Sequence, residues 1–162
     1  MNKTSLFTIW VDADSCPTPA RDLIIRFSLR LELTCIFVAN REISIPKKNP
    51  LFKMIICDVT PDAADNYIVQ NAEENDIVIT RDIPLAARLV EKKIQVINDR
   101  GILYDESNIR ERLSLRNFNL ELFQSGLIPE KTNTYGKKEL NLFANCFDRE
   151  LQKKIRNLKS QI

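Results

Sequence analysis

Short apolar runs alternate along this chain with longer segments in which apolar residues recur every three or four positions. The short runs predict strands at roughly 6–12, Leu33 to Val38, Lys53 to Cys57, Ile77 to Thr80 and Ile94 to Ile97. The longer segments predict helices at about 18–31, from Pro61-Asp62 to about Glu74, from Asp82 to about Lys92, and at about 106–115, 117–124 and 137–158. Strands alternating with helices are typical of a parallel sheet joined by right-handed crossovers. We therefore expect an α/β fold with a central, mostly parallel sheet of about five strands flanked by helices.

The chain has the length of one domain. Its 162 residues show no internal repeat, low-complexity tract or shift in composition that marks a boundary, so we expect 1–162 to form a single domain. Polar connections are expected from Asn40 to Pro50 and from Gly126 to Gly136.

The first predicted strand ends in two carboxylates. Asp12 and Asp14 follow the apolar run Phe7-Thr8-Ile9-Trp10-Val11 directly. Sites in open α/β sheets form at the carboxyl ends of strands, and hard divalent cations prefer carboxylate oxygens. The alternative interpretation is structural: Asp12 closes the strand, and Asp14 or Ser15 caps the next helix.

Further acids stand at equivalent places in the chain. Asp82 follows the fourth predicted strand, and Asp62 and Asp65 lie in the first turn of the helix before it. If the first and fourth strands are neighbours, the side chains of Asp12, Asp14, Asp65 and Asp82 converge on one edge of the sheet. Asp62 is better explained as a helix N-cap, and Asp82 has the same alternative role.

The composition narrows the possible chemistry. The chain has no histidine, which excludes a Ser-His or Cys-His nucleophile and a His-ligated zinc centre. A general base is then a carboxylate, a lysine, a tyrosine or a metal-bound water. The net charge of +2 neither demands nor forbids nucleic acid.

We expect neither a membrane span nor an export signal in this chain. No apolar stretch approaches the length of a membrane span, and the N-terminal residues 1–5 do not resemble a signal peptide. The four cysteines show no C-x-x-C pairing and are expected to be reduced thiols. We expect a cytoplasmic protein.

Several motifs together resemble the bacterial YaiI/YqxD family, which belongs to the PIN-like superfamily. The resemblance spans roughly residues 8–150 and is carried by Val11-Asp12-Ala13-Asp14-Ser15-Cys16-Pro17, Phe37-Val38-Ala39-Asn40-Arg41, Asp62-Ala63-Ala64-Asp65, Thr80-Arg81-Asp82-Ile83-Pro84-Leu85-Ala86, Asp99-Arg100-Gly101 and Phe143-Ala144-Asn145. It implies a three-layer PIN-like fold and an acidic cluster that binds Mg²⁺ or Mn²⁺ for phosphodiester hydrolysis.

The resemblance also implies roles for single residues. Asp12 matches the first metal-binding acid of the PIN-like pattern, Asp65 the acid on the helix and Asp82 the acid after the fourth strand, while Asp14 is a second acid typical of this family. Two positions depart from the pattern: Asn66 stands where relatives often have an acid, and Arg81 where they often have a small residue.

Basic residues near the acidic cluster are candidates for holding a nucleic-acid backbone, because arginine binds phosphate in a bidentate manner. The candidates are Arg41, Arg81, Arg100 and Arg112, each of which is also explained singly as a solvated surface residue. Arg81 has two alternatives: it binds substrate phosphate, or it neutralises the acidic pocket and weakens metal binding.

Three functions remain open from the sequence. The first is a metal-dependent nuclease acting on RNA. The second is a phosphatase of the haloacid-dehalogenase kind, whose site also opens with D-x-D after a strand, although no later G-D-x-x-x-D motif follows here. The third is a non-catalytic PIN-like module that binds RNA or a protein partner.

Overall fold

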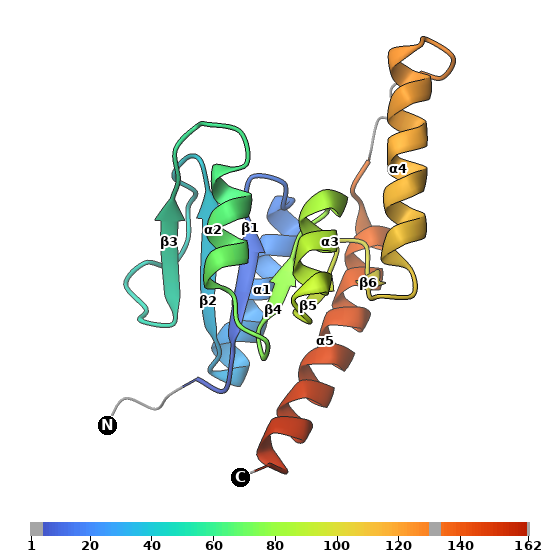
Figure 1. Cartoon of the computed structure of the whole chain (residues 1–162). Helices are drawn as coiled ribbons and strands as arrows, with labels where there is room; N and C mark the ends of the chain where they lie inside the picture. The colour runs from blue at the N-terminus through green and yellow to red at the C-terminus, as the bar shows by residue number, and fades with distance from the viewer. Residues whose placement is uncertain (1–4, 130–133, 162) are drawn as a thin grey trace.

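The computed structural model describes residues 5–129 and 134–161 and shows a twisted sheet between helices (Figure 1). The strands are β1 (Thr8–Asp12), β2 (Thr34–Ala39), β3 (Phe52–Ile56), β4 (Ile77–Ile79), β5 (Gln95–Ile97) and β6 (Leu103–Tyr104). The helices are α1 (Thr18–Leu31), α2 (Ala63–Asn71), α3 (Ile83–Glu91), α4 (Ile109–Gln124) and α5 (Lys137–Lys159). The strand order is β3-β2-β1-β4-β5-β6, and every pair is parallel except β5 with β6.

Strand β1 lies at the centre of the sheet because both of its faces are apolar. Ile9 pairs with Cys35 of β2 on one side and with Ile77 of β4 on the other. Successive side chains of a strand point to opposite faces. Ile9 accordingly packs into one hydrophobic core and Trp10 into a second core across the sheet.

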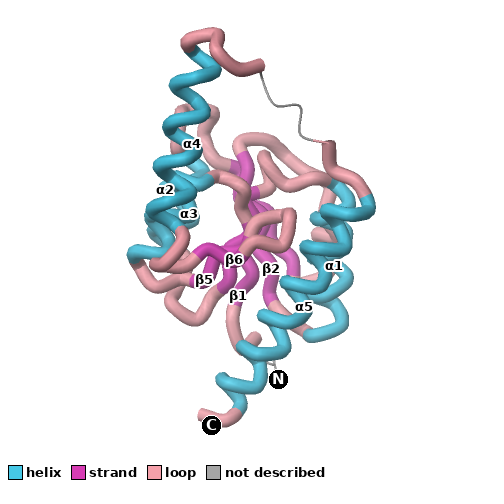
Figure 2. The backbone as a smooth tube through the Cα atoms, turned by 90° about the vertical axis from the view of Figure 1, so that its right-hand side faces the viewer, coloured by secondary structure: helices cyan, strands magenta, loops and turns pink. Residues whose placement is uncertain are grey.

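The two cores define three layers. On one face, Ile24 of α1 and Phe147 of α5 pack against the sheet. On the other face, Ile68 of α2 and Leu89 of α3 do so. Figure 2 shows α1 and α5 on one side of the strands and α2, α3 and α4 on the other. The structure therefore confirms the predicted α/β class and is consistent with a three-layer PIN-like fold.

Three details differ from the predicted elements. The sheet has a sixth strand, β6, which is only two residues long and antiparallel. The segments predicted as helices 106–115 and 117–124 form one helix, α4, because nothing at 116 interrupts the backbone hydrogen bonding. Helix α2 ends at Asn71 rather than near Glu74, since Ala72 has extended backbone angles.

Two sequence predictions fall partly outside the described residues. The connection from Gly126 to Gly136 includes 130–133, and the N-terminal stretch includes 1–4. Among the residues that are described, no helix is both long enough and apolar enough to cross a membrane.

Candidate functional site

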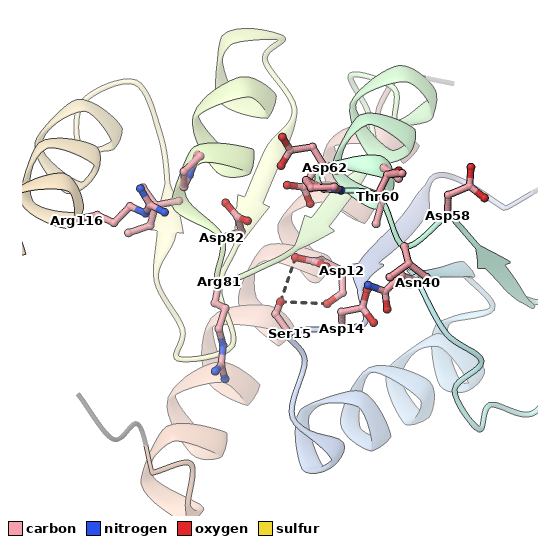
Figure 3. Close-up of a pocket in the computed structure, with 17 residues that line it drawn as sticks. Asp12, Asp14, Ser15, Asn40, Asp58, Thr60, Asp62, Arg81, Asp82 and Arg116 are labelled. Carbon is pink, nitrogen blue, oxygen red and sulfur yellow. Dashed lines mark hydrogen bonds between the residues drawn. The ribbon is translucent and has the colours of Figure 1, made fainter. Parts of the chain in front are cut away.

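A cavity of about 560 Å³ opens at the carboxyl edge of the parallel strands (Figure 3). Aspartates dominate its lining: Asp12, Asp14, Asp58, Asp62, Asp65 and Asp82. Two arginines, Arg81 and Arg116, also line it. The condition set in the sequence analysis is met, since β1 pairs with β4, and this pairing is what brings Asp12 close to Asp82. The four acids singled out from the sequence all line this cavity.

Asp12 is the most buried of these acids, with 6% of its surface exposed. Its Oδ2 accepts hydrogen bonds from Thr80 Oγ1 at 2.7 Å and from Ser15 Oγ at 3.1 Å. Burial raises the pKa of Asp12, and the charges of Asp82 and Asp14 add to the rise, whereas the two hydroxyl hydrogen bonds oppose it. The carboxylate is thus fixed in position and sensitive to nearby positive charge.

Asp82 and Asp12 share one hydrogen-bonding partner. The Thr80 hydroxyl that donates to Asp12 also accepts from the backbone N–H of Asp82 at 3.0 Å. Asp82 Oδ1 in turn accepts from Leu85 N at 3.0 Å, which caps α3. The capping alternative for Asp82 is therefore correct. Oδ2 of that carboxylate has no hydrogen-bond partner among residues 5–129 and 134–161.

Asp14 connects two loops at the sheet edge. Its Oδ2 accepts from the backbone N–H of Asn40, just beyond β2, at 2.8 Å. Neither Asp14 nor Ser15 caps α1, whose N-cap position is Pro17 and whose cap lacks a side-chain hydrogen bond. The helix-capping alternative for Asp14 and Ser15 is wrong, because Pro17 and Pro19 start the helix further along and the two polar side chains bond elsewhere.

Asp65 and Asp62 border the other side of the cavity from α2. Asp65 lies in the first turn, and partial burial together with the charges of Asp82, Asp12 and Asp62 raises its pKa to about 6, against a lowering effect of Arg88. Asp62 occupies the N-cap position, as its alternative role predicted, but with a left-handed φ of 65° and no side-chain capping bond. Both carboxylates therefore line the cavity, and the Asp62 side chain does not cap the helix.

Arg81 forms an ion pair with Asp99, which is not part of the cavity lining. Its Nε lies 3.1 Å from Asp99 Oδ2, and its Nη2 contacts the same oxygen. The Asp99 side chain is only 3% exposed. Figure 3 shows the Arg81 side chain pointing away from Asp82. Its charge is thus already engaged by Asp99 rather than by the cluster of aspartates.

The other three predicted arginines lie outside the cavity lining. Arg41 is exposed on the loop after β2. Arg100 lies over the Tyr135 ring at 5.9 Å, and Arg112 lies over the Tyr104 ring at 5.8 Å. The structure instead brings Arg116 of α4 to the cavity. The sequence analysis missed Arg116 because it placed a helix break there; its spacing of four residues from Arg112 was the available signal.

The donor chemistry of the cavity suits a hard divalent cation. Asp12, Asp14 and Asp82 each use one carboxylate oxygen in the hydrogen bonds above, so the second oxygen of each has no protein partner in the described ranges. Carboxylate oxygens are the ligands that Mg²⁺ and Mn²⁺ prefer. As placed, however, no three Asp, Glu, Cys or His groups of residues 5–129 and 134–161 are gathered closely enough to hold a metal ion.

Comparison with known proteins places this chain in a family. The model described as "Uncharacterized BCR, YaiI/YqxD family" matches residues 10–153. A UPF0178 protein of Treponema denticola is 50% identical over 148 residues, covering 91% of this chain and 94% of the relative. A UPF0178 protein of Psychromonas ingrahamii is 49% identical over 146 residues, covering 90% and 96%. No solved structure shows a significant match. The chain belongs to the YaiI/YqxD family, as its motifs predicted.

Proposed function

We propose that this protein is an RNA nuclease that uses Mg²⁺ or Mn²⁺ held by the acidic cavity. One observation carries the proposal: Asp12, Asp65 and Asp82, from three separate parts of the chain, line a single cavity at the carboxyl edge of a parallel sheet. Like charges brought together at partial burial destabilise the fold unless a cation binds there. The motif resemblance to PIN-like nucleases points to the same chemistry.

The residues of the chain would divide the work. A divalent ion, when bound, would activate a water molecule and polarise the scissile phosphate. Asp12 and Asp82 are held in place by Thr80 and by the start of α3, so they offer oxygens in fixed positions. Asp65, whose pKa is raised to about 6, loses its proton near neutral pH and adds a further negative oxygen. Arg116 stands at the rim, where a phosphate enters.

Cleavage of end-labelled single-stranded RNA tests the proposal. We expect cleavage with Mn²⁺ or Mg²⁺, none in EDTA, and none with Asp12→Asn, while Asp22→Asn on the exposed surface of α1 cleaves like the wild type. Circular dichroism checks that each variant is folded.

Two outcomes would overturn the proposal that this protein is a nuclease. Hydrolysis of p-nitrophenyl phosphate with RNA left intact would instead support a phosphatase of the haloacid-dehalogenase kind. RNA that binds but stays intact with every metal would support the non-catalytic module.

A further inference from the structure

Helix α4 leaves the body of the protein beside the acidic cavity. Its first half packs on α3, and Ile109 at its start is buried. Its second half projects beyond the carboxyl edge of the sheet (Figures 1 and 2). Arg116, at the middle of the helix, extends towards the cavity (Figure 3). The projecting half therefore borders the space into which the cavity opens.

One face of α4 continues from Arg116 along the projecting half. Leu120 and Phe123 follow Arg116 at intervals of four and three residues, which places them on one face of the helix. Leu127 follows the end of α4, just beyond Gly126 with its left-handed φ of 73°. These three apolar side chains are 41%, 42% and 72% exposed. Apolar groups in line with a cavity and left in water are typical of a surface that binds a ligand.

The charge of this face favours a polyanion. Arg112 lies one turn before Arg116 on the same side, and the two glutamates of α4, Glu111 and Glu121, lie at other positions of the helical repeat. Within residues 5–129 and 134–161, Arg116 donates to Asn117 Oδ1 and has no carboxylate partner. Arg116 and the exposed ring of Phe123 lie on the same helical face two turns apart. An arginine and an exposed aromatic ring on one surface can bind the backbone and the unpaired bases of a single strand.

We propose that the face of α4 formed by Arg116, Leu120 and Phe123 binds single-stranded RNA and leads it into the acidic cavity. Arg116 contacts a phosphate at the cavity rim, and the Phe123 ring stacks on a base that has left the cavity. Duplex RNA lacks free base faces and is excluded from this stacking. The proposal rests on the nuclease function above and assigns its substrate as single-stranded.

Binding in EDTA tests this face separately from cleavage. The probe is fluorescein-labelled oligouridine, measured by anisotropy with the full chain, and a duplex of the same length serves as the second probe. Phe118→Ala is the matched control, because Phe118 is 56% exposed on the same helix but lies on the opposite face from Arg116. We expect Phe123→Ala to weaken binding at least about fivefold, as the loss of one stacked base does. Arg116→Ala should weaken it and flatten its salt dependence.

Several outcomes would overturn the proposal. The proposal fails if the wild type does not bind the single strand, or if it binds the duplex more tightly. It also fails if Phe118→Ala loses as much affinity for the single strand as Phe123→Ala does. Light scattering that shows a dimer, dissociated by Phe123→Ala, would make this face a protein interface instead.

The two proposals fail in different ways. If binding depends on Phe123 but no cleavage occurs in Mn²⁺, the nuclease proposal is wrong and the binding face is supported. If Phe123→Ala changes neither the cleavage rate nor the affinity for RNA, the proposed binding face is wrong and the nuclease proposal stands.

Discussion

Thr80 donates a hydrogen bond to Asp12 Oδ2 across 2.7 Å, joining two residues that lie 68 positions apart in the chain. The contact exists because β1 and β4 are neighbours in the sheet and both end at this edge. Thr80 is itself buried, so the bond is shielded from water. The bond fixes the position of Asp12, the most buried of the cavity's aspartates.

Removing the Thr80 hydroxyl should destabilise the protein. Thr80→Val keeps the shape of the side chain but leaves the buried Asp12 with one donor fewer, and the free energy of unfolding should fall by about 1–3 kcal/mol. The pKa of Asp12 should rise further, since the Thr80 bond lowers it. Urea unfolding measures the change, and Thr80→Ser, which keeps the hydroxyl, should recover most of it. A Thr80→Val variant as stable as the wild type would show that the bond contributes nothing.

Asp65 should make stability depend on pH. Its pKa of about 6 lies above the ordinary 3.8, so between these values the folded state binds more protons than the unfolded state. The stability contributed by this group is therefore present below about pH 4 and is lost as the pH rises through 6. In EDTA, Asp65→Asn should unfold at higher urea than the wild type at pH 7 and at equal urea at pH 4. Asp22→Asn, exposed on α1, should show no such difference; a variant that is less stable at pH 7 would reverse the expected sign.

Asp82 has a structural role that can be separated from its charge. Asp82→Asn keeps a side-chain oxygen that accepts from Leu85 N and should melt no lower than the wild type in EDTA. Asp82→Ala loses the cap of α3 and should be less stable by about 1 kcal/mol. Thermal melting of the two variants distinguishes the roles. If Asp82→Asn and Asp82→Ala lowered the melting temperature equally, the charge of Asp82, and not its capping bond, would be what stabilises the protein at this position.

Arg81 and Asp99 should be coupled in stability. Arg81→Ala leaves the Asp99 carboxylate buried without its cation and should cost about 2 kcal/mol, less than for a fully buried pair because Arg81 is 35% exposed. Asp99→Asn in the same chain should restore part of the loss. A double-mutant cycle in urea measures the coupling, and additive effects would contradict the pair. Strong coupling would also show that Arg81 is engaged by Asp99 and not by substrate.

Periodicity was sufficient to predict a mostly parallel sheet and strands β1 to β5. Strand ends placed Asp12 and Asp82 where they meet provided that the first and fourth strands are neighbours, which the structure shows. The two-residue strand β6 was beyond them, because it is antiparallel and too short to carry an apolar pattern. The pairing of Arg81 with Asp99 was equally hidden, since it depends on the loop after β5 and joins residues 18 positions apart. The left-handed backbone of Asp62 follows from the turn before α2, which the helical pattern does not specify.

The selected acids reach the cavity both from strand ends and, in the case of Asp65, from the start of helix α2. The four selected acids line one cavity, yet three of the four selected arginines do not. A long flexible side chain on a surface helix is placed by the tilt of that helix against its neighbour. Arg116 reaches the cavity from α4, and its spacing of four residues from Arg112 was the available signal in the sequence.

Titration of Mn²⁺ by calorimetry at pH 7 tests most directly whether the acidic cavity is a divalent-cation site. We expect the wild type to bind Mn²⁺ and Asp12→Asn to bind it at least about tenfold more weakly, because a central oxygen ligand loses its charge. Asp22→Asn on α1 should bind like the wild type. Equal binding by the wild type and Asp12→Asn, or no binding by either, would contradict the metal-dependent account.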